Sequence, residues 1–422
     1  MTTRIEQVEG REILDSRGRP TVWARCRLAS GAVGSASVPS GASTGAAEAH
    51  ELRDGDAARY GGLGCRRAVE SINGELNRAL AGVRIEEPIE LDQRLVECDG
   101  TPDKSRLGAN ALLAVSIAFA RATAAQRGVP LYVSLSEALG TSPQRLPRPT
   151  INLFSGGKHA GGQVSIQDVL IIPAVARTID EVLSTTFAVY ERAAEQAQTE
   201  YGMRRLRADE GGLAPPFPTI EAMLEAAVEA IRAARYEPGH DVALAIDVAA
   251  SHFYRDGLYL LGDERLDSEA MIARIARWVE QYPIVSVEDG LAEDDWAAWP
   301  LLREAIGGRA RVVGDDLLCT QTARIERAIE SRAADTLLLK VNQVGTLSEA
   351  AEACRRARSA GWQVTVSARS GETEDDWLAD LAVGWGGDQI KVGSITQSER
   401  LAKYNRLLAI EGETAWPIVD WP

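Results

Sequence analysis

The chain has 422 residues, of which 45% are hydrophobic and 25% charged, ordinary values for a soluble globular protein of one to three domains. Its formal net charge of −15 argues against nucleic acid or an anionic membrane as the main partner, but a bound metal can invert the local charge for an anionic small substrate. The sequence has no apolar run of about 18 residues, no signal-peptide-like start and no C-x-x-C pair, so we expect a cytoplasmic protein with reduced thiols.

The first part of the chain reads as strands followed by helices. Residues 1–60 contain strand-like segments separated by turns, and residues 65–135 are rich in Ala and Leu with helical spacing. This order predicts an α+β domain. Pro143, Pro147 and Pro149 then indicate a linker, so we predict one domain over residues 1–140 and a second over residues 141–422.

After residue 150, short apolar runs alternate with helical segments. The runs are residues 164–173, 242–249, 283–289, 311–316, 336–342, 362–370 and 389–394. Alternating strands and helices predict a parallel sheet, and this number of units favours a (β/α)8 barrel. A doubly wound open sheet is the alternative, but no G-x-G-x-x-G follows the first strand.

The strand-like parts of several of these runs lead into a charged residue. Asp247, Glu288 and Asp315 stand at the ends of three successive strand-like parts, and Lys340 and Lys391 follow apolar residues of later ones. In a barrel these side chains converge on the C-terminal rim, where active sites lie. The carboxylates would repel one another there unless a hard dication bound them, and oxygen ligands favour Mg²⁺ over Zn²⁺. The alternative is that the acidic residues cap the following helices.

Lys340 follows an apolar run that is expected to be buried. Near a second lysine and dications its pKa should fall, which would make it a usable base. The alternative is a salt bridge to one of the carboxylates. Two glycine-rich stretches, residues 39–45 and residues 156–162 around His159, can serve as mobile covers or be ordinary loops.

Taken together, these motifs resemble the enolase family from end to end. The resemblance rests on ILDSRG (13–18), PSGASTG (39–45), EAHELRDGD (48–56), GGKHAGG (156–162), DEGGLAP (209–215), VEDGLAEDDW (287–296), VGDDL (313–317), LLKVNQVGT (338–346), ARSGETED (368–375) and SERLAKYNRLLAIE (398–411). It implies an α/β fold with an enolase-type TIM-like (β/α)8 barrel, preceded by an α+β capping domain. It also implies two Mg²⁺ ions in each active site and a small anionic phosphorylated or phosphonylated carboxylate as the substrate.

The resemblance implies a role for each matching residue. Asp247, Glu288 and Asp315 match the tight Mg²⁺ ligands, and Ser43 matches a ligand of the second ion. Lys340 matches the base that removes the C2 proton, and Glu210 matches the general acid for the departing hydroxyl. The expected substrate contacts are His159, Gln167, Asp168, Arg369, Ser370 and Lys391.

The chain departs from the family pattern mainly around the leaving group. Ala368 replaces a histidine, Asp168 replaces a glutamate, Ala208 replaces a glycine and Gln397 replaces an arginine. Three functions therefore stay open. The first is dehydration of 2-phosphoglycerate, and the second is a paralogue of secondary metabolism, such as one forming carboxyphosphonoenolpyruvate in a phosphonate-antibiotic pathway. The third is a non-catalytic scaffold or binding protein on the same fold.

The family is typically dimeric and uses an ion pair between subunits. Its two partners align with Trp23 and Ala409, so both charges are missing here. Tryptophan is a favoured interface anchor. We therefore expect a homodimer or higher homo-oligomer held by apolar packing.

Overall fold

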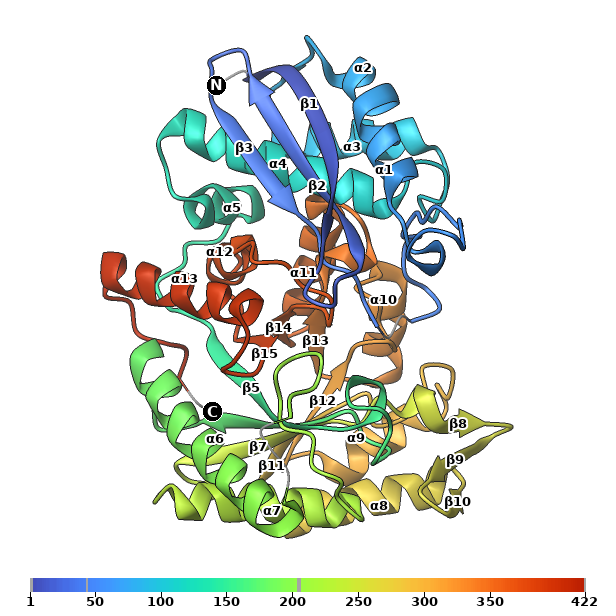
Figure 1. Cartoon of the computed structure of the whole chain (residues 1–422), viewed down its shortest axis with the longest axis vertical. Coiled ribbons are helices and arrows are strands. Elements are labelled where there is room, and N and C mark those ends of the chain that lie inside the picture. The colour runs from blue at the N-terminus through green and yellow to red at the C-terminus, as the bar shows by residue number, and fades with distance from the viewer. Residues whose placement is uncertain (1–2, 43–44, 203–205, 421–422) are drawn as a thin grey trace.

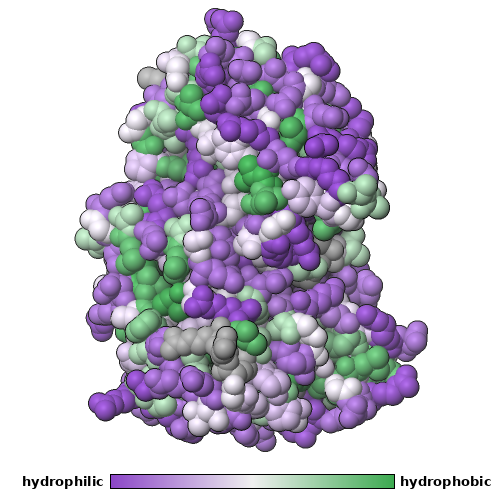
Figure 2. All heavy atoms as spheres, in the orientation of Figure 1, coloured by the Kyte–Doolittle hydropathy of each residue, from purple (hydrophilic) through white to green (hydrophobic). Residues whose placement is uncertain are grey.

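The computed structural model describes residues 3–42, 45–202 and 206–420. A small sheet with helices at the N-terminal end adjoins a larger barrel (Figure 1). The face seen in Figure 2 is mostly hydrophilic, with separate hydrophobic patches. Within the described ranges, no helix is long and apolar enough to cross a membrane.

The N-terminal sheet is antiparallel, with strand order β3-β2-β1-β4. Its elements are β1 (Thr3–Leu14), β2 (Pro20–Leu28), β3 (Val33–Ser37), β4 (Arg84–Ile85), α1 (Arg66–Ser71), α2 (Asn77–Leu80), α3 (Pro88–Asp99), α4 (Ala109–Arg127) and α5 (Leu131–Leu139). Helix α4 packs so closely on β3 that a Cβ at Gly34 would lie 2.2 Å from the Ala118 carbonyl oxygen and the Ala122 nitrogen. The predicted order of strands followed by helices is confirmed, except that the two-residue strand β4 lies between α2 and α3.

Eight strands close into a barrel in the order β11-β12-β13-β14-β15-β5-β6-β7. The strands are β5 (Arg148–Ser155), β6 (Asp168–Pro173), β7 (Val242–Asp247), β11 (Ile284–Glu288), β12 (Arg311–Gly314), β13 (Thr336–Leu339), β14 (Gln363–Ser367) and β15 (Gln389–Gly393). This closed sheet confirms the predicted barrel and excludes the open doubly wound sheet.

One strand differs from the all-parallel expectation, because β6 is antiparallel to both β5 and β7. The connection between β5 and β6 contains only a short 3-10 helix (Gly157–His159), and no α-helix returns the chain to the opposite end of the barrel. The start of β6 therefore lies at the same rim as the ends of its neighbours. Pro149 also lies inside β5, so the predicted linker does not extend that far.

The barrel is surrounded by helices and carries a small three-stranded sheet. These elements are α6 (Ile179–Tyr201), α7 (Ile220–Ala233), β8 (Tyr254–Arg255), β9 (Leu258–Leu261), β10 (Glu264–Leu266), α8 (Ser268–Gln281), α9 (Trp299–Ile306), α10 (Thr322–Ser331), α11 (Leu347–Ser359), α12 (Trp377–Gly384) and α13 (Ser398–Thr414). Several begin at a side-chain cap: Thr178 accepts a hydrogen bond from the Glu181 amide in α6, and Thr346 accepts one from the Glu349 amide in α11.

The N-terminal part packs on the side of the barrel that carries the loop after β14. The backbones of Ser40 and Gly371 exchange hydrogen bonds of 2.9 Å in both directions. An ion pair of 2.8 Å joins Lys104 to Glu349 at the start of α11. These contacts place the segment after β3 beside the C-terminal rim of the barrel.

Candidate active site

The three predicted metal ligands lie on neighbouring strands at this rim. Asp247 and Glu288 are the last residues of β7 and β11 and face each other in the strand register, and Asp315 directly follows β12. All three are buried. The three carboxylates predicted at strand ends therefore lie in one region of the fold.

Both predicted lysines form ion pairs with these carboxylates. Lys391 Nζ lies 2.8 Å from Asp247 Oδ2 and 2.6 Å from Glu288 Oε2. Lys340 Nζ binds Asp315 Oδ2. Burial is the largest influence and lowers the pKa of Lys340, but the negative charges of Asp315 and Glu288 together raise it, so the net pKa is raised. The salt bridge that the sequence offered as the alternative is thus observed, and the expected lowering of the pKa by bound dications stays a prediction.

The acidic residues have the chemistry of a site for a hard cation. Glu288 Oε1 is buried and has no hydrogen-bond partner in the described structure, so a cation could use this oxygen. Burial, followed by the Asp247 charge, raises the pKa of Glu288 well above its usual value. The donor set of Asp247, Glu288 and Asp315 contains only carboxylate oxygens, which suits Mg²⁺.

In the part of the chain that is described, other groups of possible metal ligands lie closer together than Asp247, Glu288 and Asp315 do. Ligand atoms all within 4.8 Å of one another occur in Asp289, Asp315 and Asp316, and separately in His159, Asp168 and Glu210. Asp247 and Glu288 are instead bridged by Lys391, which binds both. Ser43, expected at a second metal ion, lies outside the described residues.

Arg369 and Ser370, the residues expected to bind the anionic group of the substrate, lie in the loop after β14. Both side chains are buried. Glu48 from the N-terminal part forms a two-point ion pair with Arg369, with Nη1–Oε2 and Nη2–Oε1 distances of 3.0 and 3.1 Å. Asn342 Oδ1 accepts a further bond from Arg369 Nη1 at 2.9 Å. Glu48 and Asn342 also line a cavity of about 200 Å³.

Other side chains hold this loop in place. Ser370 Oγ accepts hydrogen bonds from the Ala42 amide at 2.7 Å and from Arg17 Nη1 at 3.2 Å. The fully buried Arg400 donates to the carbonyl oxygens of Arg369 and Ser370. Sequence reasoning assigned no role to Glu48, Asn342, Arg17 or Arg400, although each falls within a motif shared with the family.

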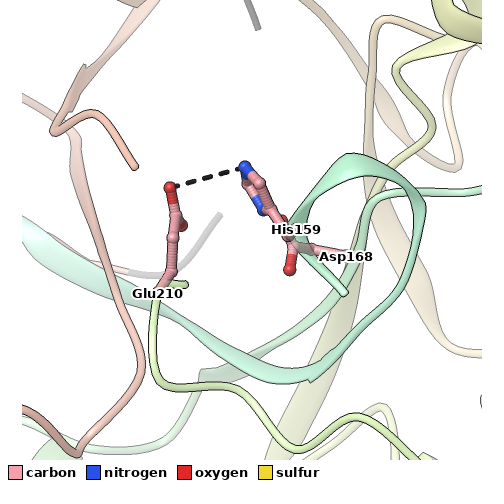
Figure 3. Close-up of side chains that lie close together, drawn as sticks. All are labelled: His159, Asp168 and Glu210. Carbon is pink, nitrogen blue, oxygen red and sulfur yellow. Dashed lines mark hydrogen bonds and ion pairs between the residues drawn. The ribbon is translucent and has the colours of Figure 1, made fainter. Parts of the chain in front are cut away.

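A second cluster joins His159, Asp168 and Glu210 (Figure 3). His159 Nδ1 lies 2.9 Å from Asp168 Oδ2, and His159 Nε2 lies 3.8 Å from Glu210 Oε1. Ser155 Oγ donates to Asp168 Oδ1 at 2.5 Å, and Asn152 Nδ2 donates to Glu210 Oε2 at 3.0 Å. Ser155 and Asn152 thus fix the two carboxylates, which lie on either side of the imidazole of His159.

The charges in this cluster are set by its neighbours. Burial lowers the pKa of His159, but Asp168 and Glu210 raise it to about 9 overall. Burial is the largest influence and raises the pKa of Glu210, but the positive charges of His159, Arg400, Lys391 and Lys340 together lower it, giving a net lowered pKa. Burial also raises the pKa of Asp168, so the raised pKa values favour a proton in the His159–Asp168 pair at neutral pH, while Glu210 is favoured in its ionised form.

Gln167 and Ala368 complete this end of the site. Gln167 Nε2 donates to Asp247 Oδ2 at 3.0 Å, and its buried Oε1 has no hydrogen-bond partner in the described structure. Ala368 follows β14, is buried, and offers only a methyl group. A side-chain hydrogen bond is therefore missing where the family pattern has a histidine.

The strand order separates the two candidate proton-transfer groups. Lys340 follows β13, and Asp168 begins β6, with three strands between them in either direction around the closed barrel. Because β6 is antiparallel and Asp168 pairs with Asp247, both groups lie at the same rim. Lys340 and the His159–Asp168 pair consequently lie on opposite sides of the barrel mouth.

Comparison with protein-family models gives two matches. A model described as the enolase N-terminal domain matches residues 5–135. A model described as the enolase C-terminal TIM barrel domain matches residues 143–417, which is more than half of the chain. The two matches follow one another along the chain, as the N-terminal sheet and the barrel do in the structure.

Proposed function

Since the chain belongs to the enolase family of lyases, we propose that it removes the C2 proton of a small anionic carboxylate and eliminates water. The proposed substrate is 2-phosphoglycerate or a close phosphorylated or phosphonylated analogue, and the product is an enolpyruvate phosphate or phosphonate. The observation that carries this proposal is the position of Lys340 opposite His159 and Glu210 across a rim lined by three carboxylates.

The chain's own residues support each part of an elimination. Lys340 is the base, and Lys391 holds the substrate carboxylate. Arg369 and Ser370 bind the phosphoryl group, with Arg369 already engaged by an internal carboxylate, Glu48. Lys340, the base, and Glu210, the expected general acid, lie on opposite sides of the rim, which suits an anti elimination. General acid–base assistance of this kind contributes about 10²–10⁴-fold.

Loss of a proton next to a carboxylate leaves a doubly negative ene-diolate, which is the main barrier. Two bound Mg²⁺ ions would offset this charge, with Asp247, Glu288 and Asp315 as ligands of one and Ser43 as a ligand of the other. Asp315 is also the ion-pair partner of Lys340. The protonation of Lys340 and the binding of a cation at Asp315 are therefore linked.

A second candidate is an enolase paralogue of secondary metabolism, such as one forming carboxyphosphonoenolpyruvate in a phosphonate-antibiotic pathway. Two observations favour it: Ala368 presents only a methyl group, and the short side chain of Asp168 is bound to His159 and Ser155. Both features change the polar groups at the end of the site where the leaving group is expected. A non-catalytic scaffold is the remaining candidate, but Asp247, Lys340 and Lys391 retain the chemistry expected of an enzyme.

The first test measures Mg²⁺ affinity by calorimetry in the wild type and in Asp315→Ala, with the fold checked by circular dichroism. Loss of one of three carboxylates should lower affinity by orders of magnitude, because Mg²⁺ prefers octahedral oxygen coordination. Unchanged affinity would remove Asp315 from the metal site.

The second test follows deuterium exchange at C2 of 2-phosphoglycerate. Lys340→Ala should abolish exchange while the substrate still binds, and the exposed Lys158→Ala is the matched control. Exchange at the wild-type rate in Lys340→Ala would mean that another group is the base. Dehydration of 2-phosphoglycerate by the wild type with Mg²⁺, together with its Mg²⁺ affinity, separates the candidates: robust turnover selects 2-phosphoglycerate, metal binding without turnover selects a paralogue, and absence of both selects a scaffold.

A further inference from the structure

Asp289, which directly follows β11, joins the segments after three neighbouring strands of the barrel. Its backbone amide donates to the Val313 carbonyl of β12 at 3.0 Å, and its own carbonyl accepts from the Ala250 amide, after β7, at 3.0 Å. Asp289 has a φ of 42°, a left-handed conformation that is uncommon for a residue with a side chain. The fold therefore fixes this residue at the rim that carries the three predicted metal ligands.

The side chain of Asp289 holds the backbone that follows β12. Its Oδ1 accepts a hydrogen bond from the Asp315 amide at 2.9 Å, and its Oδ2 accepts one from the Asp316 amide at 2.7 Å. The residue is buried, with 3% of its surface exposed. Because a buried amide that loses its acceptor is costly, both bonds constrain where the chain runs after β12.

These two bonds explain why Asp289, Asp315 and Asp316 form a close cluster, with possible ligand atoms within 4.8 Å of one another. Two adjacent amides bring the Asp289 carboxylate to the same stretch of backbone that carries the other two carboxylates. Each oxygen of Asp289 is already used by a backbone amide. The closeness of the cluster therefore needs no cation of its own to explain it.

The orientation of the Asp315 carboxylate depends on this backbone. Its Oδ1 accepts a hydrogen bond from Gln343 Nε2 at 3.0 Å, and its Oδ2 accepts one from Lys340 Nζ. Gln343 is itself held by Thr320, whose hydroxyl donates to Gln343 Oε1 at 2.6 Å. Asp315 is thus fixed at its amide by Asp289 and at both carboxylate oxygens by residues that follow β13.

We infer that Asp289 is a positioning residue for the proposed Mg²⁺ site. It sets the place of the Asp315 carboxylate through the amides of residues 315 and 316, and it is not itself a ligand. The inference rests on the proposed function, because that proposal supplies the cation. Sequence reasoning gave no role to Asp289, although it stands next to Glu288. Removing a partner that orients a metal ligand typically lowers metal affinity by about 10- to 100-fold.

The experiment measures Mg²⁺ affinity by calorimetry and the free energy of unfolding in urea for Asp289→Asn and a matched control, Asp335→Asn. Asparagine keeps one acceptor oxygen, so Asp289→Asn should fold while its Mg²⁺ affinity falls by about tenfold or more. Asp335 Oδ1 accepts the Val312 amide at 3.1 Å, near the start of the same strand and away from the rim. Asp335→Asn should therefore lower stability without weakening Mg²⁺ binding, and an equal loss of affinity in both variants would overturn the inference.

A third variant separates the loss of position from the loss of charge. Asp316→Asn removes a carboxylate from the same cluster but leaves both oxygens of Asp289 on their amides. Its Mg²⁺ affinity should fall less than that of Asp289→Asn. Amide hydrogen exchange without Mg²⁺ should become faster at residues 315 and 316 in Asp289→Asn but not in Asp316→Asn.

Three results would overturn the inference: wild-type Mg²⁺ affinity in Asp289→Asn, losses of the same size in Asp289→Asn and Asp316→Asn, or no Mg²⁺ binding by the wild type. The proposed reaction can fail separately. If the wild type binds Mg²⁺ but catalyses no C2 exchange of 2-phosphoglycerate, weakened Mg²⁺ binding in Asp289→Asn would still support the role of Asp289 while the proposed substrate fails.

Discussion

At the residue scale, a single methylene decides which group Asp168 can reach. Its carboxylate begins β6 and contacts both the imidazole of His159 and the hydroxyl of Ser155. Because both oxygens of the buried Asp168 carboxylate are already engaged, neither extends toward a substrate hydroxyl. Ala368, which follows β14, also offers no polar group. Together they weaken the polar network that assists departure of hydroxide.

We therefore predict that wild-type turnover of 2-phosphoglycerate is at least about 100-fold below that of a typical enolase, the lower end of the acid–base range. The double variant Ala368→His with Asp168→Glu should recover part of this activity, because it restores both polar groups. Steady-state kinetics with Mg²⁺ checks both statements. A wild-type rate typical of glycolytic enolase would return the chain to the first candidate function.

The rule that active-site residues follow barrel strands was sufficient to select Asp247, Glu288, Asp315, Lys340 and Lys391 from sequence. It works because parallel strands bring their ends to one rim whatever the connecting helices contain. It could not assign a role to Glu48, whose contact with Arg369 spans 321 residues and depends on how the N-terminal part docks. A salt bridge from Lys340 to one of the carboxylates was an alternative from sequence, but its partner, Asp315, is known only from the fold.

At the scale of elements, the segment after β3 and the loop after β14 are joined through Glu48 and Arg369. The pair is almost entirely buried and has two-point geometry, which resembles the way a guanidinium binds a phosphoryl group. Glu48 therefore acts as an internal anion at the proposed phosphoryl contact. Strand prediction alone cannot foresee this contact, and it also could not foresee the reversed direction of β6.

Replacing Glu48 with Gln should make Arg369 a better anion site, because the competing negative charge is removed. We expect inorganic phosphate to bind about tenfold more tightly by calorimetry, equivalent to about 1.4 kcal/mol. Stability without phosphate should fall, because breaking a buried pair leaves a charge uncompensated. Glu51→Gln is the matched control, since Glu51 contacts Arg53 and Ser40 instead. Weaker phosphate binding in Glu48→Gln would show that Glu48 helps to hold the anion.

At the scale of the whole molecule, we propose a homodimer without the family's intersubunit ion pair. Trp23 on β2 is partly buried, and the guanidinium of Arg11 lies 4.2 Å from its ring centroid, while Ala409 is exposed on α13. If apolar packing joins the subunits, dimerisation should change little between low and high salt. Sedimentation velocity at micromolar concentration tests this, and a monomer there would contradict it.

The contact between the N-terminal part and the barrel includes a buried carboxylate with an unusual pKa. Asp92 on α3 accepts a hydrogen bond from the Ser348 amide at 2.8 Å, at the start of α11. Its other oxygen, Oδ1, is buried and has no hydrogen-bond partner in the described structure. Burial raises the pKa of Asp92 to about 6 from a usual value of 3.8. Docking of the two parts therefore places a carboxylate where its charge is disfavoured.

The sign of the pH effect follows from this raised pKa. The contribution of Asp92 to stability is fully present below pH 3.8, its unfolded pKa, and is lost as the pH rises through about 6. Asp92→Asn keeps an acceptor for Ser348 but cannot ionise. The free energy of unfolding of this variant, relative to wild type, should rise by on the order of 1 kcal/mol between pH 5 and pH 8. Urea unfolding at the two pH values measures it, with the exposed Asp180→Asn as control. A difference that does not change with pH would mean that Asp92 remains ionised at pH 5 in the folded protein.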